Sequence, residues 1–393
     1  MLNRANSYPT VMARGETNGA FEVLIEKLVY GGRGLGRLEG RVVLVPLVLP
    51  GETVRVQVER ERRGLLEARL LEVVSPAPAR VQPPCPYFGR CGGCQYQHAA
   101  CEFELEAKRE ILRETFERVG KLAPPGEIAA VAGPPWEYRN RTGFHIERGR
   151  IGYFESGSHR LCPVDRCLIC SPKINETLAA LRAGRLPRAE SVEVFTNETD
   201  VQMNVPAAAG ALDYAAAGET YRVGPRSFFQ TNRFLLDEMV RCALEGAAGE
   251  TALDLYAGVG LFSLPLARRI GSVTAVESGA AAARDLEFNA ARAGLPVEVK
   301  HSPVEMFLAA LAGTPDFVLA DPPRAGLGPR VAGELLRLGP PRLAIVSCDP
   351  ATLARDLAPL AAGGYRLERL TLIDLFPRTY HIETVAQLRA GDR

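Results

Sequence analysis

Hydrophobic and polar residues alternate along the first part of the chain with the period of a β-strand. Three segments show this alternation: residues 21–26, 42–45 and 53–59. Glycine-containing turns at residues 31–36 and 49–52 separate them. Several short strands with glycine turns in such a short stretch are typical of a small β-barrel. The pattern predicts an OB-like barrel over residues 15–75, preceded by a flexible tail at residues 1–14.

The pattern changes after residue 75. A proline-rich linker runs to Pro84, and a cysteine-rich segment follows it. Residues 101–120 are rich in Glu, Lys, Arg and Leu and contain no Pro and no Gly before Gly120, which predicts a helix. Strand and loop patterns then extend to about residue 215. We therefore expect a central α+β domain over residues 76–215.

From about residue 220, apolar strand segments alternate with Ala- and Leu-rich helical segments. The strand segments are residues 252–255, 272–276, 317–320 and 343–346. Strands that alternate with helices predict an open parallel sheet with crossover helices. We expect a Rossmann-like domain with a mostly parallel sheet over residues 216–393, so the whole chain is predicted to be a multidomain α/β protein.

The composition narrows the class of protein without fixing its partner. The chain has 393 residues, 47% of them hydrophobic and 24% charged, which is ordinary for a globular protein. No apolar segment approaches the length that spans a bilayer, and residues 1–20 lack the apolar stretch of a secretion signal. We expect a cytoplasmic protein that does not act on membranes. The net charge of +1 does not exclude RNA, because local patches bind RNA.

Seven of the nine cysteines fall within one third of the chain. Three of them stand close together, at Cys85, Cys91 and Cys94. A fourth thiol would come from a second group: Cys162, Cys167 or Cys170. Three local thiolates and one remote thiolate suit an iron–sulfur cluster. Zinc is the alternative, because Cys91/Cys94 and Cys167/Cys170 could form two CxxC pairs. Disulfides are not the expected use of thiols in an intracellular protein.

A glycine loop of the cofactor-binding kind follows the first parallel strand. It runs from Asp254 to Gly260, and a glycine such as Gly258 lets the backbone approach a ligand closely. The third glycine of the dinucleotide fingerprint and the Walker lysine are both missing. Glu277 ends the next strand, where a carboxylate can accept hydrogen bonds from ribose hydroxyls. This favours adenosylmethionine over NAD. At 321–324 the sequence is Asp-Pro-Pro-Arg, and the arginine replaces the aromatic residue typical of amino-methyltransferases.

Cys348 and Glu383 have the chemistry of covalent methyl transfer to a pyrimidine. Cys348 follows the apolar run 342–346, at a strand end where ligands of such sheets bind, although a single cysteine there is ordinarily a small buried hydrophobe. A thiolate that adds to C6 of uracil makes C5 nucleophilic, and a base must later remove the C5 proton. Cys348 could supply the thiolate and Glu383 the base.

These motifs resemble those of the RNA uracil-5-methyltransferases, in particular the iron–sulfur members that act on 23S rRNA. The resemblance covers the chain from about residue 15 to the C-terminus and includes the order of the motifs. The barrel resembles their TRAM domain. The box from Cys85 to Cys94 resembles their cluster motif, and the resemblance implies Cys167 as the fourth ligand. It also implies Cys348 as the nucleophile, Glu383 as the proton acceptor and a set of adenosylmethionine contacts at Gln230, Tyr256, Glu277 and Asp321.

The expected function is therefore methylation of C5 of one uridine in 23S rRNA, with S-adenosylmethionine as methyl donor and a 4Fe-4S cluster in the central domain. RNA is the expected partner, and no obligate protein partner is predicted. We expect the cluster to be structural or to position RNA, because this chemistry needs no redox step. The alternatives are the same reaction on tRNA, or a non-catalytic RNA-binding iron–sulfur protein. On spacing alone, the barrel is equally consistent with RNA binding and with a structural or dimerising role.

Overall fold

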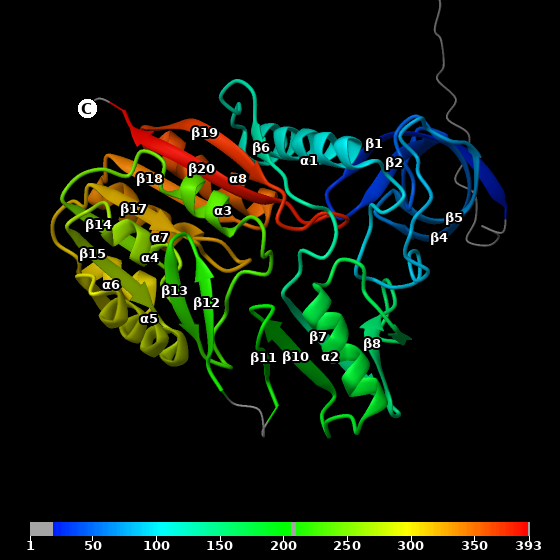
Figure 1. Ribbon diagram of the computed structural model, residues 1–393. Helices are drawn as coiled ribbons and strands as arrows, with labels where there is room; N and C mark the ends of the chain where they lie inside the picture. Colours follow the sequence, from blue (N-terminus) through cyan, green and yellow to red (C-terminus); the bar gives the residue numbers. More distant parts are fainter. Residues whose placement is uncertain (1–18, 206–209, 392–393) are drawn as a thin grey trace, which may run out of the picture. The chain divides into compact units, whose positions relative to one another are not determined.

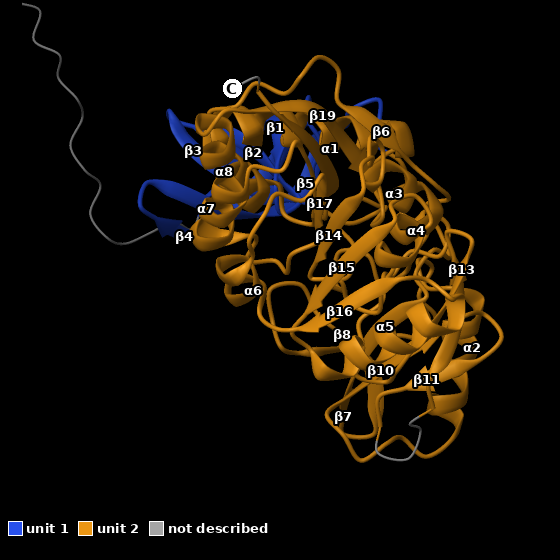
Figure 2. Ribbon diagram, turned by 90° about the vertical axis from the view of Figure 1, so that its left-hand side faces the viewer, with its two compact units in different colours: residues 1–80 blue, residues 81–393 orange. Residues whose placement is uncertain are grey.

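The computed structural model describes residues 19–205 and 210–391. The chain divides into two compact units, residues 1–80 and 81–393, which Figure 2 colours separately. The tail expected at residues 1–14 lies outside the described residues. The boundary expected near residue 215, between the central and the catalytic domain, falls inside the second unit.

The first unit is a closed barrel of five strands, as the alternating pattern predicts. Its strands are β1 (Ala20–Val29), β2 (Arg33–Leu38), β3 (Arg41–Pro46), β4 (Thr53–Arg62) and β5 (Leu65–Ser75). Alternate residues such as Val43, Val45, Val54 and Val56 are fully buried inside the barrel. Gly34 is required on β2, because a Cβ there would lie 2.4 Å from a methyl carbon of Val48.

The central part of the second unit carries a sheet of five strands in the order β11-β10-β7-β8-β9. The elements of this part are α1 (Cys101–Thr115), η1 (Phe116–Gly120), β6 (Ala129–Val131), β7 (Arg141–Glu147), β8 (Arg150–Phe154), β9 (Leu161–Pro163), α2 (Pro172–Ala183), β10 (Ser191–Thr196), β11 (Val201–Met203) and the hairpin strands β12 (Leu212–Ala216) and β13 (Glu219–Val223). Helix α2 begins where Ser171 caps it, with its side chain accepting a hydrogen bond from the Ile174 N–H. Its Ile174 and Leu178 then pack on the sheet.

The C-terminal part of the second unit, which we call the catalytic part because the sequence predicts catalysis there, has a sheet of eight strands in the order β16-β15-β14-β17-β18-β20-β19-β6 (Figure 1). Its elements are α3 (Leu236–Ala243), β14 (Thr251–Leu255), α4 (Ser263–Ala267), β15 (Ser272–Glu277), α5 (Ala280–Ala293), β16 (Val297–His301), α6 (Val304–Ala310), β17 (Phe317–Ala320), α7 (Gly328–Leu338), β18 (Arg342–Ser347), α8 (Pro350–Ala362), β19 (Tyr365–Ile373) and β20 (Glu383–Ala390). All four strand segments expected from the apolar runs are present. Helices α6, α7 and α8 cover one side of the sheet, and α3, α4 and α5 cover the other (Figure 2).

Two features of this sheet place the site. Strands β16, β15, β14, β17 and β18 are parallel, so their carboxyl ends meet at one edge. Strand β20 is antiparallel to β18, so it begins at the edge where the parallel strands end. Strand β6, which comes from the central part of the chain, pairs with β19 and extends the same sheet.

Among the described residues, no helix is both long and apolar enough to cross a membrane.

Candidate active site

Five predicted site residues stand at the ends of five neighbouring strands, along one edge of the large sheet. In sheet order they are Glu277 at the end of β15, Tyr256 after β14, Asp321 after β17, Cys348 after β18 and Glu383 at the start of β20. Neighbouring strands of a sheet lie about 4.8 Å apart. The topology therefore brings together residues that span more than one hundred positions of the sequence.

Cys348 and Glu383 lie across one strand pair. Ser347, the last residue of β18, is the register partner of Thr384 on β20, so Cys348 follows β18 where Glu383 begins β20, and the charge of Glu383 acts on the Cys348 thiol. Glu383 is only 4% exposed. Burial, together with the negative charge of Asp321, raises the pKa of Glu383 well above its ordinary value. Burial first, and Glu383 second, raise the pKa of Cys348 to about 11, while Arg324 opposes this rise. Both shifts are toward the protonated form of the group.

Asp321 occupies the next strand end and is tied to Gln230. The Gln230 side-chain amide donates a hydrogen bond to Oδ2 of Asp321 at 3.1 Å. The Asp321 N–H in turn donates to the carbonyl of Leu255 on β14 at 3.2 Å. Burial raises the pKa of Asp321 to about 7, and the Gln230 hydrogen bond acts against that rise. The contact joins two residues that the sequence had assigned to the same cofactor.

The glycine loop turns sharply at the end of β14. Tyr256, Gly258 and Gly260 all have positive φ, which is uncommon for a residue such as tyrosine. The Gly258 N–H donates to Oε2 of Glu277 at 2.9 Å, so the two predicted cofactor elements hold each other in place. A Cβ built on Gly258 meets nothing within 4 Å, so the loop faces open space at this point. A carboxylate has about four acceptor positions, and Glu277 therefore keeps the capacity to bind hydroxyl groups.

A buried ion network, which the sequence analysis missed, anchors the segment that leads into Glu383. The Lys108 ammonium on α1 contacts a carboxylate oxygen of Asp374 and one of Glu104, each at 2.8 Å, and all three side chains are less than 10% exposed. Glu104 also accepts the Arg378 N–H at 2.7 Å. Because a buried charge without its partner is costly, these contacts hold residues 374–378 against α1. The only sequence signal was the i,i+4 spacing of Glu104 and Lys108, which is ordinary for a surface helix.

The same segment is also tied to the residues that follow the cysteine box. The N–H groups of Gln95 and Tyr96 both donate to the carbonyl of Arg378, at 2.8 and 3.0 Å. His381 packs between the rings of Phe376 and Tyr380, with centroids 5.5 and 4.3 Å away. Burial and the nearby Arg324 cation lower the pKa of His381 to about 4, so it is neutral at ordinary pH.

Four predicted metal-binding thiols line one small cavity, with a volume of about 70 Å³. They are Cys85, Cys91, Cys94 and Cys167. The other two candidates for the fourth position, Cys162 and Cys170, are buried and do not line it. A hydrogen bond with Cys170 lowers the pKa of Cys167 to about 6, whereas burial raises the pKa of Cys91 and Cys94 to about 12. In the described part of the chain, no three His, Cys, Asp or Glu side chains form a group that could hold a metal ion.

Two protein families match parts of the chain. The TRAM domain matches residues 16–71, and the family described as tRNA (Uracil-5-)-methyltransferase matches residues 305–390, which include Asp321, Cys348 and Glu383. Among solved structures, the chain is similar to the Pyrococcus abyssi tRNA (uracil-54, C5)-methyltransferase in complex with S-adenosyl-L-homocysteine. That likeness has a TM-score of 0.75 and 26% identity, and covers 94% of this chain and 100% of that one.

Curated relatives match over nearly the whole length. A protein of Alkalilimnicola ehrlichii, named 23S rRNA (uracil(1939)-C(5))-methyltransferase RlmD, is 35% identical over 93% of this chain and 96% of its own. A protein of the same name from Chromohalobacter salexigens is 36% identical over 93% of this chain and 88% of its own. Identity at this level over this length, together with the two domain matches, shows that the chain belongs to the RNA uracil-5-methyltransferase family.

Proposed function

We propose that the protein transfers a methyl group from S-adenosylmethionine to C5 of one uridine in 23S rRNA. The observation that carries this proposal is the proximity of Cys348 and Glu383 at the adjoining ends of β18 and β20. A thiol and a buried carboxylate at the ligand-binding edge of a parallel sheet suit a reaction that needs a nucleophile and a base. The names of the two curated relatives support the choice of RNA.

The reaction divides into three steps. The Cys348 thiol loses its proton to solvent, and its sulfur bonds to C6 of the uracil ring, which places negative charge on C5 and O4. C5 then takes the methyl group from the donor, so that C5 carries both the new methyl and its original hydrogen. Glu383 removes that proton, the electron pair restores the C5–C6 double bond, and the C6–sulfur bond breaks to return the thiolate. The uridine must leave its stack to enter the site.

The glycine loop and its neighbours fit a methyl donor of this kind. Gly258 faces open space, and Tyr256, Glu277, Asp321 and Gln230 surround the same edge of the sheet. We propose that the carboxylate of Glu277 binds the ribose hydroxyls and that Asp321 and Gln230 hold the donor's polar groups. The donor supplies an electrophilic methyl carbon on a sulfonium. The Pyrococcus abyssi relative was solved with the demethylated product of this donor, which supports the assignment.

The rate of thiol addition should depend on pH in a direction fixed by Cys348. Its pKa of about 11 leaves only a small thiolate fraction at neutral pH, and this fraction rises with pH. We expect the rate of adduct formation with 5-fluorouridine RNA to rise about tenfold per pH unit between about pH 7 and 9. Rapid-quench trapping at several pH values measures this, with RNA affinity measured in parallel. A flat or falling profile at constant affinity would contradict the assignment.

The cysteine cavity supplies four thiols, the donor set of an iron–sulfur cluster, although no three of them form a metal-holding group in the described structure. Four thiols line one space, and the cavity wall also includes Gly93, which has no side chain to fill that space. We propose that Cys85, Cys91, Cys94 and Cys167 hold a 4Fe-4S cluster. Such a cluster can carry electrons, but we assign this one a structural role, because the chain that leaves Cys94 continues directly into the contacts on Arg378. Cluster loss would therefore loosen the segment that ends at Glu383.

A Cys91→Ser variant tests the cluster. After anaerobic purification, we expect the unaltered protein to contain iron and acid-labile sulfide in equal amounts, and the variant to lose most of both. A lower melting temperature should accompany this loss, because the cavity wall is no longer crosslinked. Cys242→Ser is the matched control, since Cys242 is buried on α3, outside the cavity. Zinc in place of iron in the unaltered protein would contradict the assignment of an iron–sulfur cluster.

The substrate is tested with purified protein, tritiated methyl donor and unmodified RNA. We expect label in 23S rRNA, at C5 of a single uridine, and none in tRNA. Label confined to tRNA would favour the alternative substrate. The similarity to the Pyrococcus abyssi tRNA methyltransferase is the reason to test tRNA. RNA binding without label in either RNA would favour the non-catalytic alternative.

A further inference from the structure

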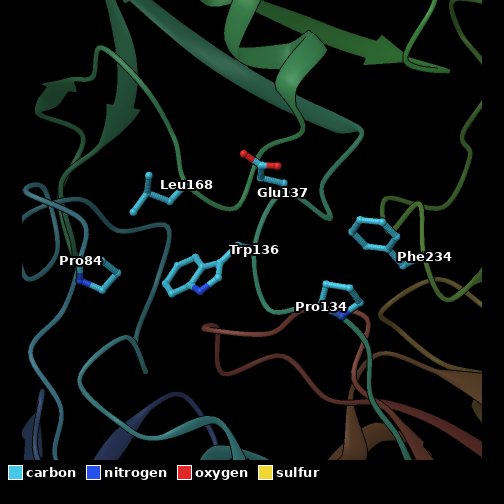
Figure 3. Close-up of a pocket in the computed structure, with 6 residues that line it drawn as sticks. All are labelled: Pro84, Pro134, Trp136, Glu137, Leu168 and Phe234. Carbon is cyan, nitrogen blue, oxygen red and sulfur yellow. The ribbon is translucent and has the colours of Figure 1, made fainter.

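A second cavity, which shares the wall residue Leu168 with the thiol cavity, opens beside the segment that leads to Glu383. It has a volume of about 410 Å³, and its walls come from four separate stretches of the chain (Figure 3). The residues that line it are Pro84, Pro134, Trp136, Glu137, Leu168 and Phe234. Apart from Glu137, these side chains are apolar, and two of them are aromatic. The wall therefore offers flat, apolar surface to a ligand.

Arginine side chains border this cavity. The Arg233 guanidinium lies 4.5 Å from the centre of the Phe234 ring and donates to the carbonyl of Glu137 at 2.8 Å. Arg166 bonds to the Glu137 carboxylate at 3.0 Å, and its side chain is 61% exposed. Aromatic rings next to arginine are the usual means of holding an unstacked nucleotide, since the ring stacks on the base and the cation meets the phosphate.

Three short connections link the residues beside this cavity to the segments that carry the proposed catalytic groups. Tyr138, two residues after Trp136, donates its hydroxyl to the carbonyl of Pro377 at 3.0 Å. Asn232, two residues before Phe234, donates to the carbonyl of Leu375 at 2.9 Å. Gln230, which contacts Asp321, is four residues from Phe234, a span of at most about 14 Å. These connections place the cavity within reach of a nucleotide next to a uridine bound at Cys348.

We propose that this cavity binds the base of a nucleotide that flanks the methylated uridine, with Trp136 and Phe234 as the stacking surfaces and its phosphate at Arg166 and Arg233. The proposal rests on the proposed function. Lifting one base out of a folded RNA leaves its neighbours without a stacking partner, and an aromatic pocket compensates for that loss. The arginines at the border favour a ligand with phosphate over an apolar peptide segment. The pocket would select the sequence or shape next to the target, which the reaction centre alone does not read.

The chain offers a direct reporter, because Trp136 is its single tryptophan. We would titrate the full-length protein with a stem–loop oligonucleotide of 23S rRNA that contains the methylated uridine, and record tryptophan fluorescence. Stacking on the indole should quench or shift the emission. Oligonucleotides with one abasic position each, on either side of the uridine, should restore the emission of the free protein at one position only. If the protein methylates the oligonucleotide but its tryptophan emission does not change on binding, the pocket proposal is overturned and the proposed function is not.

A pair of phenylalanine variants supplies a second measurement. Phe234→Ala should raise the KM for RNA about 5- to 150-fold, the range expected for one lost base–aromatic stack. Phe288→Ala on α5 is the control, because the two rings are similarly exposed, at 40% and 43%, and each has an arginine over it. Phe288 does not line the cavity. Equal KM values in the two variants would overturn the proposal. Quenching of the tryptophan emission without any methylation would support nucleotide binding in the cavity and count against the proposed function.

Discussion

A Cys348→Ala variant is expected to lose uridine methylation by more than about 10⁴-fold, because without the sulfur C5 of uracil has no means of becoming nucleophilic. The side chain is partly buried after β18, and alanine fits the same space, so the fold should survive. Single-turnover transfer of a labelled methyl group to 23S rRNA gives the rate. RNA affinity, measured separately, should stay within a few-fold of the unaltered protein.

The matched control for this variant is Cys242→Ala. Cys242 is another buried thiol of the catalytic part, 4% exposed on α3, and it takes no part in the proposed chemistry. Its replacement should leave methyl transfer nearly unchanged. A normal rate in Cys348→Ala, or an equal loss in both variants, would show that Cys348 is not the nucleophile.

A Glu383→Gln variant should fail at a different step. The thiol can still add and the methyl group can still transfer, but glutamine cannot accept the C5 proton. We expect turnover to fall about 10²- to 10⁴-fold and a covalent enzyme–RNA complex that already carries the methyl group to accumulate. The substitution keeps the size of a side chain that is only 4% exposed. Denaturing gels with labelled methyl donor and, separately, labelled RNA detect the complex.

The double variant Cys348→Ala, Glu383→Gln is the control for this trapped complex. Without the sulfur, no covalent RNA should remain after denaturation. If Glu383→Gln lost turnover without accumulating any complex, Glu383 would act before methyl transfer or only support the fold. A complex that persisted in the double variant would place the bond on another residue.

Much of the fold and of the site could be predicted from the sequence because the signals were local. The barrel alternation, the apolar runs of the parallel strands and the glycine loop each occupy a few consecutive residues. In a parallel sheet, strand ends meet at one edge, so Asp321, Glu277 and Cys348 could be expected at a common edge from their positions after apolar runs. The likeness to known methyltransferases gave the same residues their expected roles.

What could not be predicted depends on contacts between distant parts of the chain. Lys108 reads as a surface residue of a charged helix, yet it is fully buried against Asp374, which is 266 positions away. The register that sets Cys348 opposite Glu383 depends on β20 running antiparallel to β18, and no single segment encodes this pairing. The aromatic cavity is likewise invisible in sequence, because Trp136 and Phe234 belong to separate segments.

The most direct measurement is mass spectrometry of the protein after incubation with S-adenosylmethionine and a 23S rRNA fragment that carries 5-fluorouridine at the target position. Fluorine cannot leave as a cation, so the base-removal step stops and the covalent intermediate persists. After digestion, the account predicts one modified peptide, with the methylated nucleotide attached to Cys348. A nucleotide on a different residue, or methylated product with no adduct at all, would contradict it.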